Sequence, residues 1–309
     1  MPIISHHPQH YTTWNLVSQV YNEFVSDKVT VIDTMWRENK EMEKLVSQAL
    51  DNNHKVVVMN WLDELRGEFR NDIYQHNDIL VLHYLWPLLK TCEQYFQPVE
   101  WDQVQPNNFD YNFMCYGFKE KPWRKKLYRA LQDTKVKGLL SYGTEKNFTE
   151  KIEYSWGNSN MEPSNDDPNF PKTVDIYSLG DMTLWRSHFL NIVSESQVGV
   201  YEPVWITEKT FKPIIGGRPF IVYGHPDTAK HLQEIGFEIF DEDFGHTPDP
   251  WYKYHAYHIA DIVKEVSTTD VKSWYEKLLP KIEHNFHNWT TYAQHEHNKM
   301  ISRVQEFLC

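Results

Sequence analysis

The chain has no long run of apolar residues and few cysteines. No stretch approaches the roughly 18 consecutive apolar residues that a transmembrane helix needs, so we expect no membrane span. The three cysteines, Cys92, Cys115 and Cys309, are odd in number and far apart, as in proteins whose thiols stay reduced. The first residues lack the charged and apolar regions of a secretory signal. The sequence therefore predicts a cytoplasmic protein.

Positive charge is also scarce. The formal net charge is −12 at pH 7, whereas a broad nucleic-acid interface needs clustered lysine and arginine. An apolar content of 40% is typical of a globular protein rather than a disordered one. With 309 residues the chain is long enough for two modest domains, each with its own core.

Strands alternate with helices in the first third of the chain. The apolar patterns predict strands at residues 29–33, 55–59 and 78–82, and helices at 11–25 and 38–50. This rhythm is typical of an α/β layer with a mainly parallel sheet, which binds ligands beyond the carboxyl ends of its strands. Asp33, Asp63 and Glu64 follow strands in this way, so they are candidate catalytic carboxylates.

The rest of the chain repeats the rhythm after an expected linker at residues 97–108. Strands are expected at 111–116, 138–142, 189–196, 219–223 and 237–240, and helices at 122–131 and 227–235. Residues 154–173 are polar and predict a long loop, and residues 271–308 predict two terminal helices. The fold class is therefore α/β.

The segment 205–224 carries the most specific pattern. Thr207 is a candidate N-cap, followed by Glu208 and Lys209 in the first turn of a short helix, which Gly216 and Gly217 end. Free N–H groups and the helix dipole favour an anion at such an end. A carboxylate can hold both hydroxyls of a ribose, and a lysine can bind phosphate. The alternative is an ordinary capped helix with a solvated Glu-Lys pair.

The longer segment resembles the donor-binding segment of the α1,3-fucosyltransferases, and more closely that of fucosyltransferase-like enzymes of phages and marine microbes. The match rests on Trp205-Ile-Thr-Glu-Lys209, a short helix, and an apolar strand that ends at Gly224. The resemblance covers roughly residues 110–245. It implies that Glu195 belongs to the donor site, and that Arg124, near a helix start with Lys119, Lys121 and Arg129 around it, meets the donor's diphosphate. A buried structural role for Glu195 is the alternative.

The resemblance implies a GT-B-like fold, in which two Rossmann-like domains face a cleft. We expect an acceptor-side domain at 1–105, a donor-binding domain at 106–270 and C-terminal helices at 271–309 that pack back on the first domain. The implied activity is an inverting, metal-independent hexosyl or pentosyl transfer with a nucleotide-sugar co-substrate and no cofactor. A carboxylate of the first domain would deprotonate the acceptor hydroxyl. The preferred candidates are Asp63 and Glu64, and Asp33 is the second choice.

Two metal-binding patterns are weaker. Asp241 and Asp243 have the Asp-x-Asp spacing of metal-dependent glycosyltransferases and follow an expected strand. His284 and His287 could share a helix face, with His295 and His297 further along, but no cysteine or well-placed acid completes a set. We therefore expect no metal site.

Two other functions remain open at this point. One is a phage-type glycosyltransferase that acts on hydroxymethylated DNA bases, against which the acidic net charge counts. The other is a non-catalytic protein that binds a nucleotide or a carbohydrate. The sequence leaves the acceptor open between a glycan and a modified DNA base.

Overall fold

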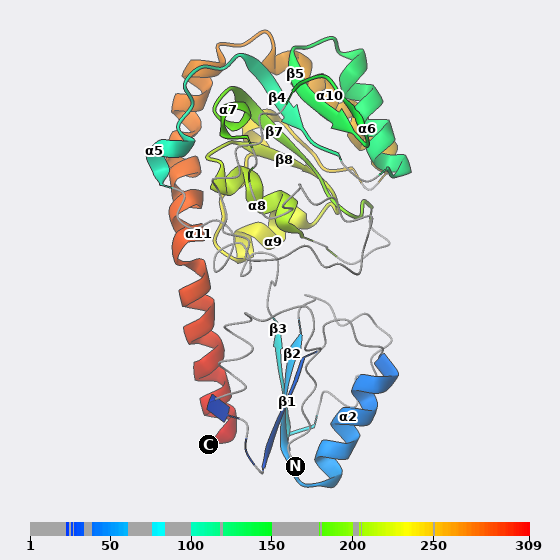
Figure 1. The fold of residues 1–309 in the computed structure, drawn as a ribbon, viewed down its shortest axis with the longest axis vertical. Helices are drawn as coiled ribbons and strands as arrows, with labels where there is room; N and C mark the ends of the chain where they lie inside the picture. Colours follow the sequence, from blue (N-terminus) through cyan, green and yellow to red (C-terminus); the bar gives the residue numbers. More distant parts are fainter. Residues whose placement is uncertain are drawn as a thin grey trace. The chain divides into compact units, whose positions relative to one another are not determined.

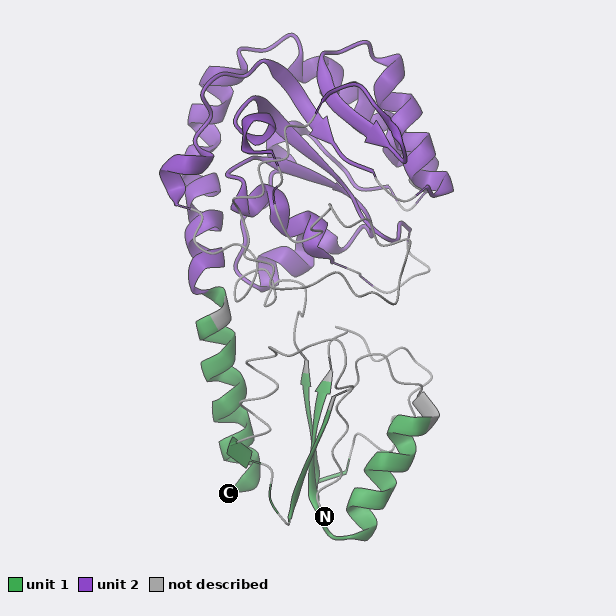
Figure 2. Ribbon diagram, in the orientation of Figure 1, with its two compact units in different colours: residues 1–89, 292–309 green, residues 90–291 purple. Residues whose placement is uncertain are grey.

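A computed structural model describes residues 23–24, 26, 28–33, 39–60, 76–83, 100–117, 120–149, 179, 181–199, 204, 206–249 and 251–309. The chain forms two compact units, coloured separately in Figure 2. Unit 1 consists of Met1–Leu89 and Tyr292–Cys309, and unit 2 of Lys90–Thr291. Sheets in both units are dominated by parallel pairing, so the α/β fold class is confirmed.

Unit 1 contains a three-stranded parallel sheet in the order β1-β2-β3. Its strands are β1 (Val29–Asp33), β2 (Lys55–Asn60) and β3 (Ile79–His83), and α2 (Asn39–Asp51) connects the first two. The predicted strands and helix are confirmed to within one residue. Ile32, Met42, Val46, Ala49, Val56, Val58 and Ile79 form the core between helix and sheet. Consecutive residues of β1 and β2 are buried, as is usual for parallel strands covered on both faces, and the α2 residues have helical spacing.

The last helix, α11 (Val271–Leu308), is a single helix of 38 residues, so the prediction of two terminal helices is wrong. No glycine interrupts it, and buried apolar residues recur along it: Leu278, Ile282, Phe286, Trp289, Tyr292, Met300 and Val304. Pro280 lies inside the helix without ending it. The end of α11 belongs to unit 1, where the Lys55 ammonium donates to the Phe307 carbonyl at 2.7 Å.

Unit 2 contains a five-stranded sheet in the order β6-β5-β4-β7-β8. Strands β5, β4, β7 and β8 are labelled in Figure 1. Its strands are β4 (Tyr111–Cys115), β5 (Gly138–Tyr142), β6 (Glu145–Lys146), β7 (His188–Ser194) and β8 (Phe220–Tyr223). All of its pairings are parallel except that of the short β6 with β5. Every residue of β7 is buried, as expected for an interior strand of a parallel sheet.

The main helices of unit 2 are α6 (Pro122–Asp133), α8 (Glu208–Ile215), α9 (Thr228–Glu234) and α10 (Tyr252–Val266). The first three were expected. The fourth was missed, although its buried residues Ala256, Ile259, Val263 and Val266 have helical spacing. Helix α10 packs against α6 (Figure 1).

Two irregular regions differ from the prediction. The expected linker contains the short helix α5 (Trp101–Val104), because Glu100 and Gln103 form a capping box. The expected strand at 237–240 is irregular and leads into the 3-10 turn η2 (Glu242–Phe244). Its neighbour Asn285 replaces a strand partner: the Asn285 side chain accepts from the Glu238 N–H at 2.7 Å and donates to the Glu238 carbonyl at 2.9 Å.

Several predictions lie outside the described residues. They include most of the 11–25 helix, the 154–173 loop, and the side chains of Asp63 and Glu64. Within the described ranges no helix has both the length and the hydropathy of a bilayer-spanning segment.

Buried histidines should make unit 2 sensitive to acid. His188 has no exposed surface; its Nδ1 bonds the Leu184 carbonyl at 2.8 Å and its Nε2 lies 3.4 Å from the Asn191 amide. Burial, together with the Arg218 charge, lowers the pKa of His188 to about 3. Below about pH 6.5 the unfolded chain therefore binds a proton at His188 that the folded chain does not bind. The free energy of unfolding falls as the pH drops from about 6.5 toward 3.

The expected cost at His188 is about 2–3 kcal/mol between pH 6.5 and 4.5, at about 1.4 kcal/mol per pH unit. Urea unfolding of the wild type and of His188→Gln across this range measures it. The pH dependence of the unfolding free energy should be shallower for the variant by about one proton. Equal slopes for the two proteins would show that His188 titrates normally in the folded state.

Candidate functional site

The sheet of unit 2 has a point at which its strand order reverses. From β4 the chain moves to β5 on one side, and it then crosses to β7 on the other side of β4. In open parallel sheets such a switch point opens a crevice at the carboxyl ends of the two strands, and ligands bind there. Helix α6 follows β4 and helix α8 follows β7, so the starts of these helices lie on the side of the sheet where β4 and β7 have their carboxyl ends. The candidate residues of the second half lie on these two elements and at the end of β7.

Thr207 caps α8 as the sequence predicts. Its backbone is extended (φ −117°, ψ 179°), and its hydroxyl oxygen accepts from the Lys209 N–H at 3.4 Å. The same hydroxyl donates to Glu195 Oε2 at 2.7 Å. Gly216 ends the helix against Trp185, where a Cβ at Gly216 would lie 2.3 Å from a ring carbon. Both ends of this short helix are therefore fixed.

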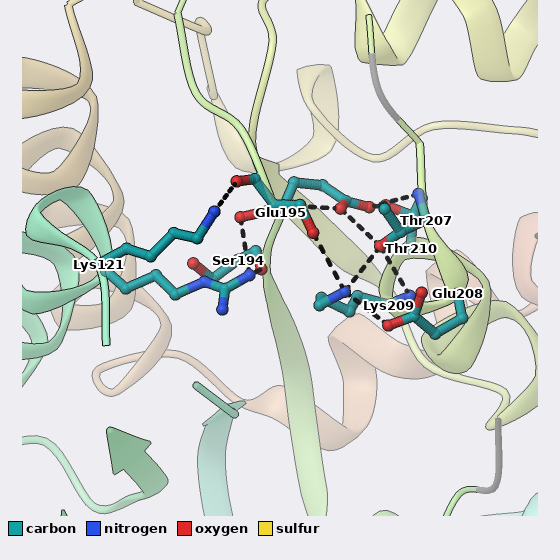
Figure 3. A network of polar contacts seen from close by, with 9 residues as sticks. Lys121, Ser194, Glu195, Thr207, Glu208, Lys209 and Thr210 are labelled. Carbon is teal, nitrogen blue, oxygen red and sulfur yellow. Dashed lines mark hydrogen bonds and ion pairs between the residues drawn. The ribbon is translucent and has the colours of Figure 1, made fainter. Parts of the chain in front are cut away.

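Glu195 holds the start of α8 against the end of β7 (Figure 3). Its side chain is fully buried. Oε1 accepts from the Thr207 N–H at 3.0 Å and the Thr210 hydroxyl at 2.6 Å. Oε2 accepts from the Ser196 N–H at 3.0 Å and from the Thr207 hydroxyl. A carboxylate with four donors from its own chain fixes neighbouring groups, which is the buried structural role that the sequence left open.

Glu208 and Lys209 form an ion pair at the helix start. The Lys209 ammonium donates to Glu208 Oε1 at 2.6 Å and to the Thr207 hydroxyl at 3.0 Å, and lies 3.5 Å from Ser196 Oγ. Burial opposes ionisation of Glu208, but the charge and hydrogen bond of Lys209 outweigh it, so the pKa of Glu208 lies below its usual value. The Lys209 side chain is 30% exposed and that of Glu208 13%. The cation is thus more accessible than the carboxylate.

The Arg124 side chain extends from α6 to the end of β7. Its Nη2 donates to the carbonyls of Ser194 at 3.3 Å and Glu195 at 3.1 Å, and the residue is 5% exposed. Burial lowers its pKa, while the charges of Glu195, Cys115 and Glu208 act in the opposite direction. An arginine titrates far above neutral pH, so this guanidinium stays a cation beside the end of β7.

Lys121, just before α6, adds another cation. Its ammonium donates to the Ser196 carbonyl at 3.1 Å and lies 4.9 Å from the centre of the Trp123 ring. In Figure 3 Lys121 points toward the end of β7 from the side opposite to Lys209. The end of β7 therefore lies among three cationic side chains, of which Lys209 is paired with the Glu208 carboxylate.

The structure brings together Arg124, Glu195, Thr207, Glu208 and Lys209, all of which the sequence singled out. Asp33 ends β1 in unit 1, and its side chain, like Asp63 and Glu64, lies outside the described parts. Lys119 and Trp205 are also outside them. Ser196 and Thr210 also belong to this cluster, but neither was predicted from the sequence. Thr210 lies one residue after Lys209, one helical turn from the cap, which is the only signal that pointed to it.

The Asp-x-Asp pattern loses its premise, and His284 has a partner in the backbone. Asp241 and Asp243 lie at a turn rather than after a strand; Asp243 pairs with Lys281 at 2.7 Å, and Asp241 lies 3.6 Å from His246. The His284 ring bonds the Gly236 carbonyl at 2.9 Å. In the described part of the chain no group of three or more His, Cys, Asp or Glu side chains is arranged to hold a metal ion.

No protein-family model matches the chain, and neither a curated protein nor a solved structure matches it significantly.

Proposed function

We propose that the protein is a glycosyltransferase that moves a sugar from a nucleotide-sugar donor to an acceptor hydroxyl, with inversion and without a metal ion. The observation that carries the proposal is the meeting of Arg124, Glu208 and Lys209 beside the end of β7, next to the strand switch point. The fucosyltransferase-like segment 205–224 supports the same function. The GT-B-like arrangement is part of the proposal, and the presence of parallel α/β sheets in both units supports it.

In this proposal the diphosphate binds at the N-terminus of α8. Lys209 moves from Glu208 to a phosphate oxygen, and Glu208 then accepts from the ribose hydroxyls. Arg124 stays on its two carbonyls and contributes through its charge. As the glycosidic bond breaks, negative charge grows on the diphosphate, and fixed cations stabilise that charge more than the ground state. Glu195 keeps Thr207 and the helix start in position throughout.

The acceptor side is assigned to unit 1. A carboxylate there would take the proton of the acceptor hydroxyl as the new bond forms. Asp63 and Glu64 are the preferred candidates, and Asp33 is the second choice. Inversion follows if this hydroxyl attacks from the face opposite to the diphosphate. The acceptor is a glycan in this proposal, since the net charge of −12 disfavours a duplex-DNA footprint.

A turnover assay with a panel of nucleotide sugars and glycan acceptors, with and without EDTA, tests the proposal. We expect sugar transfer or slow donor hydrolysis with at least one donor, and a rate that EDTA leaves unchanged. A rate that EDTA abolishes and Mn²⁺ restores would overturn the metal-independent mechanism. Donor binding without any turnover would instead support a non-catalytic protein, and transfer only to hydroxymethylated DNA would change the acceptor class.

A further inference from the structure

Three large aromatic side chains are exposed at the start of α10. Trp251, Tyr254 and Tyr257 are 61%, 60% and 45% exposed, the large apolar side chains most open to solvent among the described residues. Their spacing of three residues places them along one side of the helix. The side chains of Ala256 and Ile259, on the other side of the helix, are buried. We call Trp251, Tyr254 and Tyr257 the aromatic ridge; a group of large exposed aromatic side chains is typical of a binding surface.

Lysines lie directly against the aromatic ridge. The Lys126 ammonium of α6 donates to the Tyr257 hydroxyl at 2.5 Å and lies 4.4 Å from the centre of its ring. The Lys253 ammonium lies 5.9 Å from the centre of the Tyr254 ring. Lys125 and Arg129 are exposed on α6, the helix that packs against α10 (Figure 1). In a chain with a net charge of −12, this surface is locally basic.

Two carboxylates, Asp249 and Asp261, border this surface. Asp249 Oδ1 accepts from the Trp251 N–H at 2.6 Å, and Asp261, about one turn beyond Tyr257, pairs with Lys264 at 2.8 Å. Asp249 therefore places a negative charge beside Trp251, whereas Lys126 and Lys253 lie against the Tyr257 and Tyr254 rings and keep that part of the surface basic.

These features favour one class of partner. Trp and Tyr combine an apolar body with a polar tip and gather at the headgroup level of bilayers, where anionic lipids attract lysine and arginine. A protein partner fits less well, because lysine is depleted at protein interfaces. Single-stranded nucleic acid fits less well too, because it binds in basic grooves, whereas these rings stand on the outer side of a helix. We propose that the aromatic ridge and the lysines beside it dock the protein on an anionic membrane surface.

Vesicle flotation tests this proposal, which is independent of the proposed activity. The full chain is mixed with phosphatidylcholine vesicles, with or without about one-third phosphatidylserine. We expect binding to the anionic vesicles that weakens as salt is raised and is much weaker on the neutral ones. Trp251→Ala with Tyr254→Ala should lower the binding constant at least about tenfold. Lys126→Gln should lower it about fivefold.

Lys277→Gln is the control, because Lys277 is exposed on α11 and its replacement changes the net charge equally. Thermal midpoints of all variants show whether each is folded. The proposal is overturned if the wild type ignores anionic vesicles, or if the ridge variant binds them as well as the wild type. Binding of a single-stranded oligonucleotide or self-association through the ridge, without vesicle binding, would also overturn it.

Discussion

Lys209→Ala should lower the turnover of the nucleotide-sugar donor about 100-fold, the usual effect of removing one preorganised charge from a transition state. Its ammonium is the most accessible cation at the start of α8, with 30% of the side chain exposed. In the ligand-free protein it neutralises Glu208 at 2.6 Å. Steady-state kinetics with the donor that the panel identifies measures the change.

The fold should survive this substitution. Thr207 still caps the helix, and Glu195 still holds Thr207 and Thr210, because neither set of bonds depends on the ammonium. Lys230→Ala is the matched control, since Lys230 is 73% exposed on α9. A Lys209→Ala enzyme with a rate within about twofold of the control would remove Lys209 from the mechanism.

Arg218→Met should have the largest effect on stability. Arg218 is 1% exposed, and its guanidinium donates to the Trp185 carbonyl at 2.7 Å, the Val104 carbonyl at 3.0 Å and the Gly217 carbonyl at 2.6 Å. Val104 and Trp185 end α5 and α7 (Met182–Trp185), and Gly217 follows α8. The negative ends of these helices thus surround one cation. Burial lowers the pKa of Arg218 to about 10, so it remains charged at neutral pH.

Methionine would remove the Arg218 donor from the Trp185 and Val104 carbonyls, while the Gly217 carbonyl would keep the Tyr275 hydroxyl at 3.1 Å. At about 1–3 kcal/mol for each lost partner, we expect a loss of about 3–5 kcal/mol in the unfolding free energy of unit 2. Urea unfolding measures it, with Arg129→Met, an exposed arginine of α6, as the control. Arg218→Lys should lie between the two, since it keeps the charge but not the planar fork. Equal stability of Arg218→Met and the control would show that the helix ends do not need this cation.

The regular strands and the α8 cap could be predicted from the sequence because local signals and tertiary contacts agree there. Val56 and Val58 are apolar, β-branched and buried, and Thr207 both follows the cap pattern and packs against β7. The prediction of a strand at 237–240 was wrong because the side chain of Asn285, far along the chain, forms the hydrogen bonds of the Glu238 backbone. The prediction of an irregular linker at 97–108 missed helix α5, because capping by Glu100 outweighs the effect of two nearby prolines.

The donor-side residues could be predicted from the sequence, but the contacts that each of them makes could not. The identity of Glu195 does not reveal that four donors of its own chain occupy it, since those donors depend on the approach of α8 to β7. Arg218 lies inside the 205–224 segment, but no role was predicted for it from the sequence. Its role depends on three helix ends that are far apart in the sequence.

Thermal unfolding with a panel of nucleoside diphosphates and nucleotide sugars tests the proposed donor site most directly. A ligand that binds only the folded state adds about 2.7 kcal/mol at 100 times its dissociation constant. We predict that at least one member of the panel stabilises the wild type and Lys230→Ala, and that Lys209→Ala loses most of this shift. A panel without any effect, or an equal shift in Lys209→Ala, would contradict a nucleotide-sugar site at the start of α8.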